Sequence, residues 1–175
     1  MNTPTKKQSE RGQRQRIIIG VGDIQITDDR GVELITYALG SCIGVTVYDP
    51  VAGVGGLLHF MLPNAGIDKA KAALKPAMFG DTGIPLLFKS CYKLGAVKER
   101  LVVCAAGGAE IMDDSSRFRI GPRNRTMIRK IFWKNSVLLS AEDSGGTISR
   151  TMSMQMDSGQ VSVTHKGEKK ILWPE

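Results

Sequence analysis

The amino-acid sequence predicts a single α+β domain built in layers. About eight short segments have the alternating or continuous apolar pattern of β-strands, and two longer segments have helical periodicity. The order of these segments is irregular, which argues against a doubly wound parallel sheet. The chain has 175 residues, a length that fits one domain, and 42% of them are hydrophobic, which is enough for a substantial core.

The first 16 residues differ in composition from the rest of the chain. They carry five basic side chains against Glu10, a net charge of +4 out of the +7 of the whole chain, and they contain no aromatic residue. This composition predicts a disordered basic leader over 1–16, followed by one domain over 17–175. Nucleic-acid binding remains open only for this leader, because the sequence has no aromatic interleaving and no recognised nucleic-acid motif.

Hydropathy and cysteine usage favour a cytoplasmic protein. No apolar run approaches 18 residues and the N-terminus has no apolar h-region, so neither a transmembrane helix nor a secretory signal is expected. The three cysteines, Cys42, Cys91 and Cys104, form no CxxC pair and fit reduced thiols. With only two histidines, the sequence predicts no metal site, and it contains no cofactor motif.

The first third of the domain is predicted to be mainly β-structure. Asp49-Pro50 and Pro63 end two of the segments, and short turns between successive segments favour antiparallel neighbours. Residues 64–80 are expected to form a loop with a helical turn. The predicted strands cover 17–22, 32–38, 42–49 and 55–61.

Two helices and four more strands are predicted beyond residue 80. The first helix begins at Asp81 or Thr82, tolerates Pro85 in its first turn and ends near Leu94. The second opens at Gly121-Pro122 and ends at Asn135. Their apolar faces hold Ile84, Leu87, Phe88 and Cys91, and Ile128, Ile131 and Phe132. The further strands cover 100–106 and 137–142 and a hairpin of 147–156 with 160–166, in which Met152, Met154 and Met156 share one face.

Cys42 is the cysteine whose surroundings suit a nucleophile. It follows a Gly-Ser turn, which could present the backbone N–H groups of Ser41 and Cys42 to a developing oxyanion. His59 lies 17 residues later, one predicted strand further along, where neighbouring strands about 4.8 Å apart could bring the two side chains together. A histidine beside a thiol can accept its proton. Spacing alone leaves open that both are core residues.

A longer pattern around these residues resembles a known family. The segment "ITYALGSCIGVTVYDPVAGVGGLLHFMLP" is similar to the signature of the chemoreceptor glutamine deamidase family, CheD, with Thr36, Cys42 and His59 followed by Met-Leu-Pro. The resemblance continues through "AAGGAEIM", "IGPRN", "AEDSGGTISR" and "DSGQVSV", and so covers nearly everything after residue 16. The segment "AMFGDTGIP" departs from the family's usual helix entry.

This resemblance implies a fold, a reaction and partners. The fold would be a layered α/β/β sandwich of mixed, largely antiparallel sheets with two main helices. Cys42 and His59 would form the catalytic dyad, with Thr36 as the third catalytic position and a thioester intermediate. The enzyme would be a protein-glutamine glutaminase acting on glutamine side chains of the cytoplasmic helices of methyl-accepting chemotaxis proteins, without a cofactor, metal or membrane insertion.

An alternative function remains open at this point. The family also binds a phosphatase of the CheC type, so the domain could serve as a regulatory binding module with weak or vestigial catalysis. The resemblance assigns no catalytic role to Arg123 or Asn124, although both could line the site.

Overall fold

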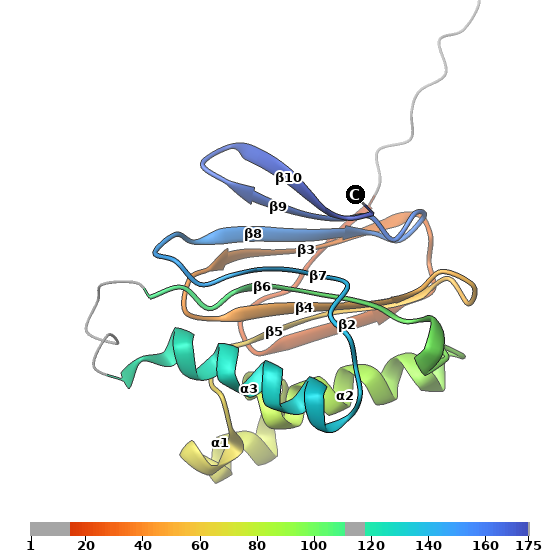
Figure 1. Cartoon of the computed structure of the whole chain (residues 1–175). Coiled ribbons are helices and arrows are strands. Elements are labelled where there is room, and N and C mark those ends of the chain that lie inside the picture. The colour runs from red at the N-terminus through yellow and green to blue at the C-terminus, as the bar shows by residue number, and fades with distance from the viewer. Residues whose placement is uncertain (1–14, 111–117, 175) are drawn as a thin grey trace, which may run out of the picture.

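The computed structural model describes residues 15–110 and 118–174, which form two stacked five-stranded sheets covered on one side by helices (Figure 1). This arrangement confirms the expected α+β sandwich with two main helices. The outer sheet has the order β1-β3-β8-β9-β10, in which only the β1–β3 pair is parallel. Its strands are β1 (Gln15–Ile18), β3 (Val32–Leu39), β8 (Arg150–Gln155), β9 (Val161–His165) and β10 (Glu168–Trp173).

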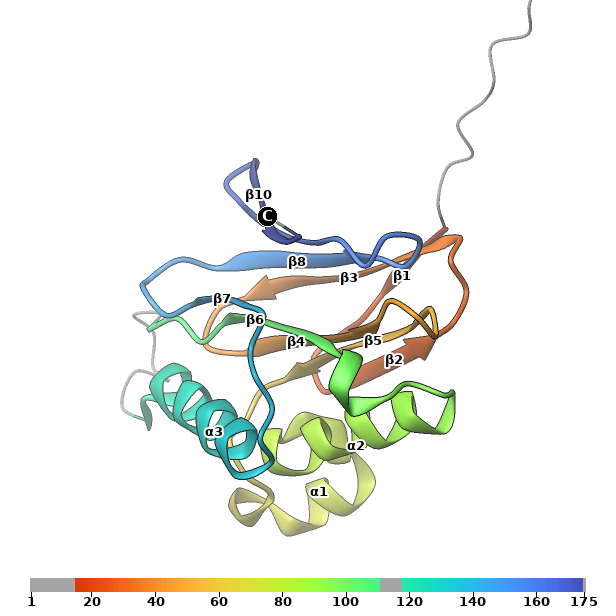
Figure 2. The same cartoon turned by 45° about the vertical axis from the view of Figure 1, so that its right-hand side comes forward.

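The central sheet lies between the outer sheet and the helices (Figure 2). Its order is β2-β5-β4-β6-β7, and only the β6–β7 pair is parallel. The strands are β2 (Asp23–Thr27), β4 (Ile43–Asp49), β5 (Val54–Phe60), β6 (Val102–Gly107) and β7 (Ala141–Ser144). The helices are α1 (Lys69–Leu74), α2 (Gly80–Lys93) and α3 (Ile120–Lys134), with short 3₁₀ turns at Ala65–Ile67, Pro76–Met78 and Lys98–Arg100.

Two apolar layers hold the sandwich together, one on each face of the central sheet. Ile43, Val45 and Val47 of β4 pack toward the helices, in the helix-side core. Tyr48 of the same strand packs against the methionines of β8, in the inter-sheet core. Because both faces of the central sheet are covered, every residue of β4 and β5 is buried.

Two of the four edge strands, β2 and β10, were not predicted. Strand β2 has only two apolar residues, Ile24 and Ile26, and β10 begins with three charged residues, so each gives only a short apolar pattern. The predicted bounds of the strand over 137–142 were wrong, because β7 begins at Ala141 and includes Asp143 and Ser144. At the start of the domain, Gln15 and Arg16 belong to β1 rather than to the leader, whereas residues 1–14 lie outside the described residues.

The two main helices bury the predicted faces but begin differently. Helix α2 starts at Gly80, so Pro85 lies in its second turn and not in the first. Neither expected cap residue caps it: Asp81 accepts the N–H of Ala65, and Thr82 donates to the carbonyl of Pro76. The inward side chains of α2 and α3 are buried as expected, with Ile131 partly buried.

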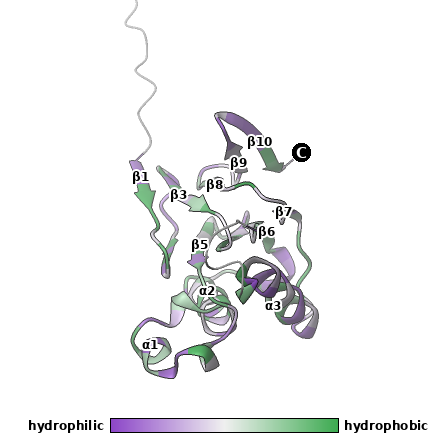
Figure 3. Cartoon of the chain, turned by 90° about the vertical axis from the view of Figure 1, so that its left-hand side faces the viewer, coloured by the Kyte–Doolittle hydropathy of each residue, from purple (hydrophilic) through white to green (hydrophobic). Residues whose placement is uncertain are grey.

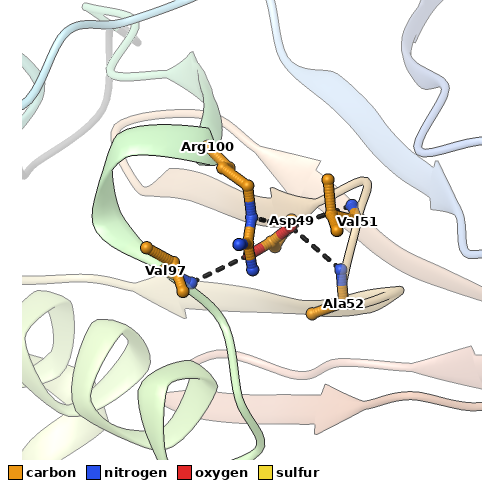
Figure 4. Close-up of polar contacts among 5 residues, drawn as sticks. All are labelled: Asp49, Val51, Ala52, Val97 and Arg100. Carbon is orange, nitrogen blue, oxygen red and sulfur yellow. Dashed lines mark hydrogen bonds and ion pairs between the residues drawn. The ribbon is translucent and has the colours of Figure 1, made fainter.

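A buried carboxylate fixes the far end of β4 (Figure 4). Asp49 accepts hydrogen bonds from the backbone N–H groups of Val51, Ala52 and Val97 and from the guanidinium of Arg100 at 2.7 Å. Burial alone raises the pKa of Asp49, but Arg100 and the backbone donors outweigh it and hold the pKa well below its usual range. This network ties the β4–β5 turn to the segment that leads into β6.

Candidate active site

Cys42 lies where the chain crosses from the outer to the central sheet. Strand β3 breaks its pairing with β8 between Thr36 and Leu39, and Ala38 adopts a left-handed conformation with φ +56°. The chain then turns and enters β4 at Ile43. Cys42 is partly exposed and packs against the inter-sheet core. The bulge after Thr36 therefore sets the path of the segment that carries the thiol.

His59 is buried in the layer between the sheets, on the same face of the central sheet as Cys42. In β5 it lies directly opposite Gly44 of β4, and cross-strand partners point to the same face. A Cβ on Gly44 would meet side-chain atoms of Thr36, Leu39 and Met152, so this face looks toward the outer sheet. Cys42 precedes Gly44 by two residues, and strand alternation gives it the same direction.

Thr36 of the outer sheet binds His59 of the central sheet. The Thr36 hydroxyl lies 2.7 Å from Nδ1 of His59 and donates to the carbonyl of Ile19, also at 2.7 Å. Since the hydroxyl has one proton and Ile19 accepts it, Nδ1 must carry the proton that is donated to Thr36. Nε2 therefore holds the lone pair. It is buried and has no hydrogen-bond partner within the described ranges.

The β1–β2 connection forms hydrogen bonds with both Thr36 and His59. Its Ile19 carbonyl accepts the Thr36 proton, and the N–H of Gly22 donates to the carbonyl of His59 at 2.7 Å. Asp23 then pairs with His59 across the β2–β5 ladder and forms an ion pair with Lys75. One short segment thus fixes both the hydroxyl and the backbone of the histidine.

The Cys42 thiol and the His59 imidazole are both uncharged near neutral pH. Burial raises the pKa of the Cys42 thiol to about 11, an effect that its own backbone N–H partly opposes. Burial lowers the pKa of His59 to about 4, and the negative charge of Asp23 acts in the opposite direction. The resting pair is therefore a thiol and a neutral imidazole, a state in which proton transfer has to accompany attack by sulfur.

The end of β6 anchors the segment that carries Cys42. The N–H of Gly108 donates to the carbonyl of Cys42 at 2.7 Å, and the N–H of Ala109 donates to the carbonyl of Gly40 at 2.8 Å. This contact requires a glycine at 107, because a Cβ there would lie 2.2 Å from the carbonyl oxygen of Cys42. Within 15–110 and 118–174, the N–H groups of Ser41 and Cys42 make no hydrogen bond to another residue.

Asn124 is a structural residue of the site whose contacts sequence reasoning did not predict. Its fully buried amide donates to the carbonyls of Ser41 and Met61, at 2.9 and 2.8 Å. It thereby joins the segment before the thiol to the end of β5, two residues beyond His59. The signal was present: Asn124 is a polar residue on the same stripe of α3 as the buried Gly121 and Ile128.

The other two cysteines are buried in the two apolar cores, as the sequence predicts. Cys91 lies in the helix-side core and Cys104 in the inter-sheet core, and burial raises the pKa of their thiols to about 12 and about 11.

The described residues contain no group of three His, Cys, Asp or Glu side chains that could hold a metal ion. None of the helices in the described part of the chain is both long and apolar enough to span a bilayer.

Comparisons with known proteins agree on one family. Residues 61–165 match the family model described as CheD chemotactic sensory transduction. A protein of Syntrophus aciditrophicus named probable chemoreceptor glutamine deamidase CheD 1 is 51% identical over 86% of this chain and 94% of its own. Proteins named probable chemoreceptor glutamine deamidase CheD from Solibacter usitatus and Pyrococcus horikoshii are 46% and 38% identical, over 91% and 90% of this chain and 95% and 97% of their own.

The matches with these relatives extend over most of the described domain, although the family model itself begins after His59. Identity of 51% over 86% of the chain, together with a family model that matches more than half of it, settles the relationship. The chain belongs to the CheD family.

Proposed function

We propose that this protein is a chemoreceptor glutamine deamidase that hydrolyses the side-chain amide of receptor glutamines through Cys42, His59 and Thr36. The names of its relatives support the reaction class. The observation that carries the assignment of residues is the Thr36–His59 hydrogen bond. It fixes the tautomer that leaves a basic nitrogen unpartnered in the layer into which Cys42 also faces.

The first half of the reaction forms a thioester. Nε2 of His59 takes the thiol proton as Sγ of Cys42 bonds to the carbonyl carbon of the glutamine side chain. The resulting tetrahedral intermediate carries a negative oxygen. His59 then gives its proton to the amide nitrogen, the C–N bond breaks, and ammonia leaves. The glutamine side chain remains attached to Cys42 as an acyl group.

The second half restores the enzyme. His59 takes a proton from water as the water oxygen attacks the thioester carbonyl. The second tetrahedral intermediate collapses, the C–S bond breaks, and the proton held by His59 returns to sulfur. The product is a glutamate side chain. Thr36 contributes by holding Nδ1–H, which keeps Nε2 directed at the reacting atoms through both halves.

The backbone N–H groups of Ser41 and Cys42 are the proposed oxyanion donors. Neither makes a hydrogen bond to another residue in the described part of the chain, and the carbonyls of Gly40, Ser41 and Cys42 are bound by Ala109, Asn124 and Gly108. With its carbonyls held by these donors, the segment can keep its N–H groups in a fixed direction beside sulfur. Fixed donors of this kind stabilise developing charge without reorganisation.

We also propose where the protein acts and which regulatory partner it binds. The targets would be the cytoplasmic helices of methyl-accepting chemotaxis proteins, so the protein would act in the cytoplasm. A phosphatase of the CheC type is the proposed regulatory partner, which would bind the same domain.

A receptor cytoplasmic fragment tests the proposal directly. The protein is incubated with the fragment, and glutamine-to-glutamate conversion is followed by peptide mass spectrometry. We expect conversion by the wild type and none by Cys42→Ala or His59→Ala, with the fold retained by circular dichroism. Cys91→Ala is the matched control, because Cys91 lies in the helix-side core. An unconverted fragment, together with tight binding of a CheC-type phosphatase, would instead favour the binding-module function.

A further inference from the structure

A groove runs between helix α3 and the segment that follows β5. It has a volume of about 630 Å³, with Pro63 and Asn64 on one wall and the outward side of α3 on the other. Three cations line it, Arg119, Arg123 and Lys130, and no Asp or Glu is among its described lining residues. We refer to this feature as the basic groove. Figure 3 faces an end of the sandwich, where α3 is largely purple, the colour of hydrophilic residues.

Within residues 15–110 and 118–174, the cations of the basic groove have no carboxylate partner. The ion pairs of α3 involve Arg125 with Glu110 and Arg129 with Glu142. Among the described residues, no ion pair is formed by the three groove cations, which are exposed. Three positive charges along one hollow, none of them paired with a carboxylate of the described residues, create a positive potential that favours an acidic ligand.

The spacing of these side chains matches a helical ligand. Arg123, Met127 and Lys130 follow one another at i, i+4 and i+7 on one stripe of α3, and Arg119 is the residue that immediately precedes the helix. With a rise of about 1.5 Å per residue, the helical stripe is about 10 Å long. The N-terminal end of the 15-residue helix α3 adds its positive dipole at the Arg119 end.

The basic groove adjoins the candidate active site through the structure already described. Asn124, the neighbour of Arg123, donates to the carbonyls of Ser41 and Met61. Pro63 in the opposite wall is four residues beyond His59. A segment bound in the groove would therefore place its continuation next to the loop that carries Cys42.

We propose that the basic groove binds an acidic helical segment of the substrate protein and so holds a neighbouring glutamine at Cys42. This inference rests on the proposed function, because it assigns the docking surface of the same reaction. A protein helix fits better than a nucleic acid, since the cations are few and flank the apolar Met127, with Phe118 exposed at the end of the stripe. The reaction product is itself a carboxylate, so a helix that carries several targets becomes more acidic as it is processed.

Binding measured without turnover tests the docking surface. The Cys42→Ala protein is titrated with a receptor cytoplasmic fragment, and Arg123→Glu or Lys130→Glu is then added to it. Each reversal should weaken binding about tenfold, and added salt should remove most of the difference. Lys134→Glu is the matched control, because it makes the same charge change on α3 outside the groove and should alter binding less than twofold.

Turnover separates this inference from the proposed function. With an intact Cys42, Arg123→Glu and Lys130→Glu should raise KM for the fragment about tenfold and leave kcat within twofold. Binding that depends on the two cations in a protein without deamidase activity would refute the proposed function and keep the groove. Unchanged binding in both variants would overturn the groove, as would displacement of the fragment by a duplex nucleic acid that binds the same cations.

Discussion

At the scale of single residues, the central feature is a hydroxyl group that can only accept from the imidazole. Thr36 gives its proton to the carbonyl of Ile19, and this leaves His59 one way to satisfy Nδ1. The tautomer is therefore set by a backbone carbonyl of the β1–β2 connection. In a Ser-His-Asp triad, by contrast, a carboxylate sets it. A neutral partner fits a histidine that is itself neutral in the resting protein.

Replacing Thr36 tests this arrangement. Thr36→Val keeps the shape of the side chain but removes the acceptor. It leaves Nδ1–H of His59 buried without a partner, and an unsatisfied buried donor costs about 1–3 kcal/mol of stability. We expect kcat on a receptor fragment to fall about 10- to 100-fold, with KM within twofold. Thr36→Ser retains the hydroxyl and should keep at least a third of the activity. Equal loss of activity in both variants would contradict the positioning role of the hydroxyl.

The pH dependence follows from the two pKa values. His59 has to be neutral and Cys42 protonated in the resting enzyme, and their pKa values of about 4 and about 11 define the limits. We expect kcat/KM to be flat between about pH 5 and pH 10 and to fall on the acid side as Nε2 binds a proton. The alkylation rate of Cys42 by iodoacetamide should rise through this whole range. A plateau of that rate at neutral pH would reveal a thiolate–imidazolium pair instead.

The candidate residues and part of their arrangement could be predicted from the sequence. The Gly-Ser turn and the spacing to His59 make Cys42 a candidate nucleophile, and Gly44 opposite His59 confirms the expected neighbouring strands. The position of Thr36 in the other sheet has no sequence signal, because alternation reports which face a residue occupies and not which sheet covers that face. Asn124 was expected as a residue that could line the site, but its two acceptors could not be predicted, because they are backbone carbonyls, which no side-chain pattern reveals.

At the scale of elements, long apolar segments were predicted well and edge strands were not. Strands β3, β4, β5 and β6 and the buried faces of α2 and α3 follow their hydrophobic periods. Strand β10 has Leu172 as its only fully buried residue, so its order depends on pairing with β9 and not on its own pattern. Helix α2 begins at Gly80, one or two residues earlier than its polar residues suggest, since Asp81 and Thr82 bind the preceding loop.

The Asp49 network predicts a stability change that is separate from catalysis. Asp49→Asn loses the charge that three backbone N–H groups and Arg100 stabilise, so the free energy of unfolding should fall by about 2–3 kcal/mol in urea titrations at pH 7. Asp29→Asn, at an exposed turn, should change it by less than about 0.5 kcal/mol. Activity per folded molecule should be retained, because Asp49 and Cys42 lie at opposite ends of β4.

Acid should remove the same contribution from the wild type. A carboxylate whose folded pKa is depressed stabilises the protein above its unfolded pKa, and this stabilisation is lost as the pH falls toward the folded value. The wild type should therefore lose its advantage over Asp49→Asn as the pH falls below about 4. An advantage that stays constant down to pH 2 would show that the charge of Asp49 does not contribute.

At the scale of the whole molecule, the candidate site spans the two sheets. Cys42 and His59 belong to the central sheet and its entry segment, whereas Thr36 belongs to the outer sheet. The distance between hydroxyl and imidazole therefore depends on how the inter-sheet core packs, and the helix-side core affects it only through overall stability. The layered architecture thus makes the packing of one apolar layer part of the geometry of the candidate site.

Two core truncations of similar size distinguish the layers. Met152 is buried between the sheets, opposite Thr36 in the β3–β8 ladder. Leu87 is a residue of α2 that is buried in the helix-side core. Met152→Ala and Leu87→Ala should each destabilise the protein by about 2–5 kcal/mol. Well below the unfolding temperature of both variants, only Met152→Ala should lower kcat, by about tenfold, because only that cavity lets the sheets shift between Thr36 and His59. If Leu87→Ala lowered kcat equally while both variants remained folded, the site would depend on general rigidity and not on the packing of the two sheets.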